Sequence, residues 1–204
     1  MGPRNLIIAL LLGLALAAGI FVAIRTQAPP PEASSALVLP APTPLPEFQL
    51  VDHRGRAVDE SVFVGQWDLV FFGFTHCPDI CPTTLQVLST ARAALADEGR
   101  EPLPRIVLVS VDPERDTPEI LGPYVEYFGE DTVGITGSLD EVTRLASDLG
   151  IFFEKRPADG DNYLVDHSAA VLLIDPDGRF SALFSGPHRV ADYVHDLPIV
   201  MQGS

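Results

Sequence analysis

The sequence predicts an α/β sandwich with a mixed central sheet and flanking helices, and two observations lead to this fold class. From Trp67 to Gly150, short apolar runs typical of buried strands alternate with capped, periodic segments typical of helices. The chain then changes to two strands joined by a turn at Asp175–Gly178, whose Asp-Pro-Asp-Gly composition makes an antiparallel hairpin. Parallel strands with helical crossovers, followed by one antiparallel hairpin, form a mixed sheet.

The individual elements follow in order from apolar runs and capping residues. A short hairpin is expected at 47–64, and strands are expected at 67–75, 106–111, 133–136, 151–154, 170–175 and 180–184. Helices are expected where capping signals bracket a periodic segment, at 79–97, 117–129, 138–150 and 187–201. A polar loop containing Asp159–Asp161 is expected after 154, and Pro198 is expected to disturb the end of the last helix. With a cysteine pair opening the first helix, this order matches a thioredoxin-like arrangement.

Residues 1–25 are expected to form a single N-terminal transmembrane anchor. Leu6–Ile24 are 19 uncharged, mostly apolar positions, and at about 1.5 Å per residue a helix of this length just crosses a hydrocarbon core of about 30 Å. Arg4 precedes the segment and the acidic bulk of the chain follows it, which directs the amino terminus inward. A cleaved signal peptide is the alternative, because Ala15–Ala17 resembles a cleavage site.

Residues 26–46 are expected to be a linker, and residues 47–204 the globular domain. Seven of the 21 linker residues are proline and only Glu32 is charged, a composition that favours extended polyproline geometry and a semi-rigid stalk. The expected location is the bacterial inner membrane, with the soluble domain in the periplasm.

The charge of the chain excludes one class of function. The chain has 13 Lys and Arg residues and 28 Asp and Glu residues, which gives a net charge of −15. Nucleic-acid binding needs a basic surface, so the charge argues against that function. The acidity serves solubility, with a docking face for a basic partner as the alternative.

Cys77 and Cys81 are the only cysteines in the chain. At the entry of a helix their Cα atoms would lie about 6.2 Å apart on one face, which suits a disulfide as well as two thiolates on one metal ion. The helix N-terminus would favour the thiolate form. Redox dithiols usually have two intervening residues, and the three present here weaken an oxidoreductase interpretation. A stabilising disulfide would close too short a loop to contribute much.

A third metal ligand must come from the five histidines. His167 stands just before a predicted buried strand, where a loop could lie against the first helix, and Asp166 is a candidate to orient its imidazole. His76 adjoins Cys77, but neighbouring side chains on an extended segment point in opposite directions. The remaining histidines are expected on the solvated surface, namely His53, His188 and His195.

Four motifs lie at 72–82, 110–118, 134–137 and 163–168. They resemble the Sco/SenC family of membrane-anchored copper chaperones, which serve assembly of the dinuclear copper site of cytochrome c oxidase, and the resemblance spans 47–204. It implies a thioredoxin-like domain that binds one copper ion through Cys77, Cys81 and His167. It also implies a non-enzymatic protein whose partner is the copper-binding subunit of the oxidase, with other periplasmic copper chaperones or thiol reductants as further partners.

Ligand chemistry agrees with copper, since two thiolates suit Cu(I) and an added imidazole also allows Cu(II). A structural zinc site would normally have four protein ligands. Asp79 and Asp112 follow strands beside the same site and, with Asp166, are expected to surround the ligands or contact a partner, with capping and turn formation as the simpler roles. The alternative function is a thiol–disulfide oxidoreductase that keeps a partner's cysteines reduced through a Cys77–Cys81 couple.

Overall fold

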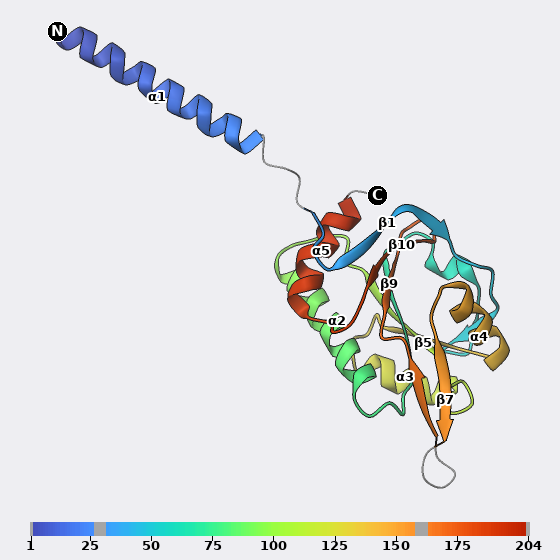
Figure 1. Cartoon of the computed structure of the whole chain (residues 1–204). Helices are drawn as coiled ribbons and strands as arrows, with labels where there is room; N and C mark the ends of the chain where they lie inside the picture. Colours follow the sequence, from blue (N-terminus) through green and yellow to red (C-terminus); the bar gives the residue numbers. More distant parts are fainter. Residues whose placement is uncertain (1, 27–31, 158–162, 203–204) are drawn as a thin grey trace. The chain divides into compact units, whose positions relative to one another are not determined.

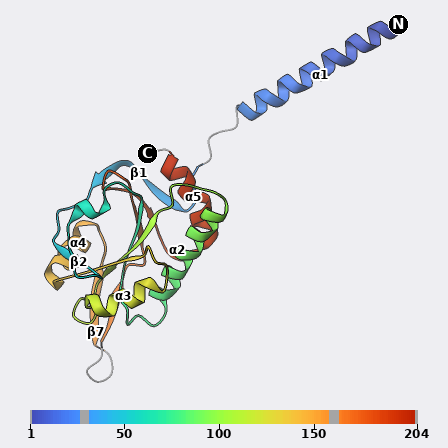
Figure 2. The same cartoon turned by 180° about the vertical axis from the view of Figure 1, so that it is seen from behind.

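The computed structural model describes residues 2–26, 32–157 and 163–202 (Figures 1 and 2). The chain divides into two compact units, Met1–Glu32 and Ala33–Ser204. The first unit is the helix α1 (Pro3–Thr26). Within it, Pro3–Phe21 is long and apolar enough to cross a membrane by length and composition, which agrees with the apolar helix expected at the amino terminus.

The second unit is built on an eight-stranded mixed sheet with the order β1-β10-β9-β4-β5-β6-β2-β3. Its strands are β1 (Ala36–Pro44), β2 (Leu50–Asp52), β3 (Ala57–Val58), β4 (Asp68–Gly73), β5 (Arg105–Ser110), β6 (Val133–Thr136), β9 (Val171–Ile174) and β10 (Arg179–Phe184). Strands β4, β5 and β6 are parallel, and the other pairings are antiparallel. The mixed sheet predicted from the sequence is therefore confirmed.

Helices cover both faces of this sheet. They are α2 (Ile80–Asp97), α3 (Pro118–Glu126), α4 (Leu139–Asp148) and α5 (Val190–Gln202), with a 3-10 helix at Glu60–Phe63. Leu108 on β5 lies in register with Phe71 on β4 and Gly134 on β6. These three positions share one face of the sheet, and that face meets α2 and α3. The opposite face, with Phe72, packs against Leu145 of α4. Figure 1 shows α5 lying beside α2, so the fold is the thioredoxin-like sandwich that the element order predicted.

Two short strands form a separate ribbon. Strands β7 (Phe153–Pro157) and β8 (Tyr163–His167) pair only with each other in the described chain. The sequence analysis predicted a strand at 151–154 followed by a polar loop, and β8 was missed. The centre of that predicted loop, Asp159–Asp161, lies outside the described residues. The consequence for the site is that His167 ends a strand instead of standing in a loop.

The predicted linker is wrong over 36–44, because these residues form β1 and the compact unit begins at Ala33. The pairing of β1 with β10 shifts register between Val38 and Thr43. Three prolines fall in the strand, Pro40, Pro42 and Pro44. β1 is an edge strand with one neighbour, and edge strands and register breaks tolerate residues without an N–H group. At the other end of the chain, α5 continues past Pro198 to Gln202.

Asp196 on α5 fixes the start of β1. Its carboxylate is fully buried and accepts hydrogen bonds from the backbone N–H groups of Ser34, Ser35 and Ala36 at 2.7–3.1 Å. His195 Nδ1 lies 2.6 Å from the same carboxylate. Burial alone would raise the pKa of Asp196, but these donors outweigh it and lower the pKa to about 2.

Replacement of Asp196 by asparagine is expected to destabilise the fold in a pH-dependent way. The lowering of the pKa from 3.8 to about 2 corresponds to about 2 kcal/mol of stability, which is present above pH 4 and disappears as the pH falls through the folded-state value. Urea unfolding of the full chain in detergent should show Asp196→Asn less stable by about that amount at pH 7, with the difference closing toward pH 2. Asp192→Asn, on the same helix and paired with the exposed Arg189, is the control and should change little. Equal stability of Asp196→Asn and the wild type at pH 7 would contradict this role.

Candidate metal centre

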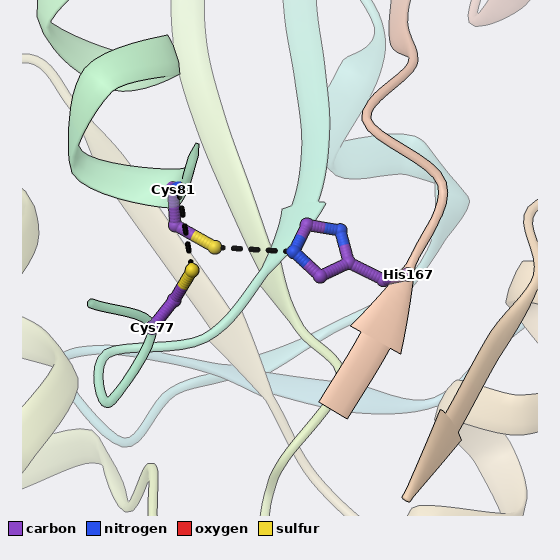
Figure 3. A group of neighbouring side chains, drawn as sticks. All are labelled: Cys77, Cys81 and His167. Carbon is purple, nitrogen blue, oxygen red and sulfur yellow. Dashed lines mark hydrogen bonds between the residues drawn. The ribbon is translucent and has the colours of Figure 1, made fainter. Parts of the chain in front are cut away.

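The two cysteines lie where β4 meets α2 (Figure 3). α2 begins at Ile80, so Cys77 is in the preceding loop and Cys81 is in the first turn of the helix, whereas the sequence analysis placed both at the helix entry. The cysteines are not bridged; Cys77 is half-buried and Cys81 is fully buried. The backbone N–H of Cys81 donates to the Cys77 sulfur at 3.4 Å, which holds the two side chains on the same side of the loop.

His167, at the end of β8, completes the cluster. Its Nε2 lies 3.2 Å from the Cys81 sulfur, and its Nδ1 lies 3.1 Å from the carbonyl oxygen of Ser168. The Nδ1–H group therefore donates to Ser168, which leaves the Nε2 lone pair directed at the sulfur. The rings of Phe71 and Phe74 meet the imidazole edge to face, with centroids at 5.6 and 5.9 Å. Burial lowers the pKa of His167, so the imidazole is neutral and able to act as a ligand.

The geometry brings together the three residues predicted as ligands. The two sulfurs and one imidazole nitrogen all lie within 4.8 Å of one another, and Figure 3 shows the side chains converging from a loop, a helix and a strand. Metal–sulfur bonds of about 2.3 Å and metal–nitrogen bonds of about 2.0 Å fit a cluster of this size. The donor atoms can therefore reach a single metal ion.

Gly73, the last residue of β4, makes room for the Cys81 sulfur. A Cβ atom at this position would lie 3.0 Å from that sulfur and 2.8 Å from Phe71 Cε1. It would also lie 3.2 Å from Leu108 Cδ1. The distance to Phe71 is shorter than real Cβ contacts and the other two are tighter than most of them, so the close approach of the helix to the strand depends on glycine.

The electrostatics of Cys81 differ from the expectation. The helix N-terminus was expected to favour the thiolate, but burial raises the pKa of Cys81, and the neighbouring Cys77 and Asp116 raise it further. In the metal-free protein Cys81 is thus a thiol, and binding of a metal must release its proton. Burial overrides the helix because the sulfur is enclosed by apolar side chains and by the backbone of β4.

The three carboxylates predicted around the site have different surroundings. Asp79 is exposed and precedes α2; in the described chain its side chain makes no capping hydrogen bond. Asp166 is exposed and forms an ion pair with Arg156 at 2.5 Å. The backbone carbonyl of Ser168 takes the His167 Nδ1 hydrogen bond, so the prediction that Asp166 orients the imidazole is wrong.

Asp112 is fully buried after β5 and accepts hydrogen bonds from Arg115 and from the Tyr163 hydroxyl. It therefore supports the ribbon that carries His167 and does not touch the ligands. Asp116, four residues further on, was not singled out in the sequence. It is also buried and accepts from the Thr75 N–H at 3.0 Å and from Ser110 Oγ at 2.6 Å. This fixes the start of the loop that carries Cys77.

Two of the histidines predicted to be solvated have structural roles. His53 is buried, and its Nδ1 accepts from the Gly134 N–H at 3.1 Å. His188 is half-buried, 2.7 Å from the Tyr193 hydroxyl and 2.5 Å from the carbonyl of Ala169, which holds the segment after His167. The partners Gly134 of His53 and Ala169 of His188 come from other parts of the fold, so no local sequence signal marks these two contacts.

Together, the fold and the cluster define a class: a thioredoxin-like domain with two cysteines and one histidine within reach of one metal ion. A family model described as SCO1/SenC matches residues 40–202, and the chain belongs to this family.

Individual relatives support the assignment. The human mitochondrial protein SCO2 homolog is 42% identical over 152 residues, which cover 74% of this chain and 56% of the relative, so the chain spans little more than half of that protein's length. A putative copper-binding protein of Stutzerimonas stutzeri is 34% identical over 168 residues and 82% of both chains. The crystal structure of Arabidopsis thaliana ScoI with copper bound superposes with a TM-score of 0.74 at 33% identity, covering 78% of this chain and 98% of that one.

A methyl group at Gly73 is expected to disturb the site. Gly73→Ala should lower the free energy of unfolding by about 1–3 kcal/mol, because the added atom overlaps Phe71, Cys81 and Leu108 in a packed interior. Gly122→Ala in α3 is the matched control, since its Cβ would meet only ordinary contacts at 3.6 Å or more and a helical glycine gains stability on replacement. Urea unfolding of the full chain measures the free energy of unfolding of both variants. An equal change in the two variants would contradict the tight packing at β4.

Proposed function

We propose that this protein is a membrane-anchored copper chaperone that binds one copper ion through Cys77, Cys81 and His167. It passes the ion to the dinuclear copper site of cytochrome c oxidase, whose copper-binding subunit is its partner. The observation that carries the proposal is the convergence of two sulfurs and one imidazole nitrogen within 4.8 Å of one another.

Donor chemistry supports copper as the cargo. Two thiolates favour Cu(I), and a neutral imidazole allows Cu(II) as well. Three protein ligands leave the coordination sphere incomplete, whereas structural zinc sites usually have four. Cys77 is the more exposed of the two cysteines, so it is the ligand that an incoming or receiving partner can reach. The copper-bound structures of relatives agree with this cargo.

The proposed location is the bacterial inner membrane, with α1 as a single-pass anchor and the copper domain in the periplasm. The apolar helix Pro3–Phe21 and the acidic bulk of the chain after it support this topology. Other periplasmic copper chaperones or thiol reductants are proposed as further partners, since the site needs both a copper source and reduced cysteines.

Copper binding to the full chain in detergent tests the proposal. The reduced protein should bind one copper ion, with sulfur-to-copper charge transfer when the ion is Cu(II). His167→Ala removes the nitrogen ligand and should weaken binding by more than about 100-fold and change the spectrum. His195→Ala is the control, because that side chain is mostly exposed and lies against Asp196. Unchanged affinity and spectrum in His167→Ala would refute the three-ligand site.

A thiol–disulfide oxidoreductase is the second candidate, favoured by the two unbridged cysteines. The burial of the two cysteines assigns their roles in this reaction. The half-buried Cys77 would attack a partner disulfide, and the buried Cys81 would resolve the mixed disulfide. Cys81→Ser should then trap a mixed disulfide with a partner, seen as a reducible adduct on non-reducing gels, while Cys77→Ser should not. The absence of any adduct in Cys81→Ser would exclude this function.

A further inference from the structure

The ribbon that carries His167 lies outside the main sheet. Strands β7 and β8 pair only with each other in the described chain, and Figures 1 and 2 show β7 extending beyond the main sheet. A two-stranded ribbon is marginally stable by itself. The position of the His167 imidazole therefore depends on the contacts that attach the ribbon to the rest of the domain.

Tyr163, the first residue of β8, makes several of these contacts, beside the buried Val165 and the Lys155–Glu114 ion pair. Its hydroxyl donates to Oδ1 of Asp112, a fully buried carboxylate that follows β5 of the main sheet. A buried carboxylate needs donors, because an uncompensated charge in the interior is costly. Burial and the hydrogen bond to Asp112 raise the pKa of Tyr163 to about 12, so its hydroxyl remains protonated and acts as a donor.

The ring of Tyr163 also contacts side chains on both sides of the attachment, one on the main domain and one on β7. The guanidinium carbon of Arg115 lies 3.8 Å from the ring centroid, and Lys155 Nζ lies 4.9 Å from it. Arg115 Nη1 also donates to the backbone carbonyl of Tyr163 at 3.4 Å. The buried Nη2 of Arg115 has no hydrogen-bond partner among the described residues.

These contacts extend to the metal ligand. Arg115 lies 5.9 Å from the ring centroid of Phe74, and the Phe74 ring meets the His167 imidazole at 5.9 Å between centroids. Tyr163, Arg115, Phe74 and His167 thus form a series of neighbouring side chains from the start of β8 to its end. Asp112 links this series to the main sheet.

We propose that Tyr163 is a positioning residue for the metal site: it anchors the β7–β8 ribbon to Asp112 and Arg115, and so holds the His167 imidazole at the two cysteines. The part of this inference that concerns copper rests on the proposed function. The placement of the imidazole does not, and it can be measured in the metal-free protein.

Three variants of the full chain in detergent test the proposal through copper. Tyr163→Ala removes hydroxyl and ring, and should weaken copper binding by about 10- to 100-fold, the usual effect of removing a residue that orients a ligand. Its Cu(II) charge-transfer spectrum should move toward that of His167→Ala. Tyr163→Phe keeps the ring beside Arg115 and Lys155 and should recover the spectrum in part. Tyr127→Ala, at an 80% exposed tyrosine, should leave affinity and spectrum unchanged.

The metal-free protein gives an independent measurement. NMR of the wild type should show ring-to-ring contacts between His167 and both Phe71 and Phe74, as the structure has them. Tyr163→Ala should lose these contacts, and Tyr163→Phe should weaken them. Wild-type contacts in both variants would overturn the proposal, as would wild-type copper affinity and spectrum in both. If the wild type binds no copper, the proposed function fails, and the ring contacts still decide the role of Tyr163.

Discussion

The burial of the Cys81 sulfur is the constraint on which the site depends. On one side the sulfur packs against the backbone of Gly73, at a distance where a Cβ atom would already be too close. On another it meets His167 Nε2 at 3.2 Å. Strand β4, helix α2 and the β7–β8 ribbon therefore meet at a single atom. Since protein interiors are close-packed and deform little, none of these three segments can shift without changing the ligand geometry.

The position of His167, and not the unequal exposure of the two cysteines, separates the candidate functions. Both the chaperone and the oxidoreductase would engage the half-buried Cys77 first and the buried Cys81 second. Only the chaperone gives a role to the imidazole, which faces the Cys81 sulfur with its Nε2 and is kept neutral by burial. A redox couple needs no third ligand, so the position of His167 is what favours the copper site as the proposed function.

The parts of the fold that local patterns encode could be predicted from the sequence. β4, α2 and the cysteine pair were predicted because apolar runs, helical periodicity and a C-terminal glycine are local signals. β1 was mistaken for linker, since its prolines suit polyproline geometry equally well and the pairing with β10 involves residues more than 130 positions away. The burial of His53 depends in the same way on Gly134. The ligand set was predictable through the motif around His167. The residues that support the ligands, such as Asp116 beside the Cys77 loop and His188 behind the segment after His167, depend on the tertiary structure.

On the proposed function the site must release its cargo, and the placement of the third ligand on a ribbon outside the main sheet suits that role. Local opening costs least where a segment has few neighbours, and in the described chain the ribbon pairs with no strand of the main sheet. Its attachments are the buried Val165 and the contacts of Tyr163 and Lys155. Cys81, by contrast, is fully buried where the central strand β4 meets α2, and cannot move without disturbing the core. On the proposed function, exchange of copper is therefore easier to start at His167 than at Cys81, while the Tyr163 contacts keep the imidazole in place until a partner competes for the ion.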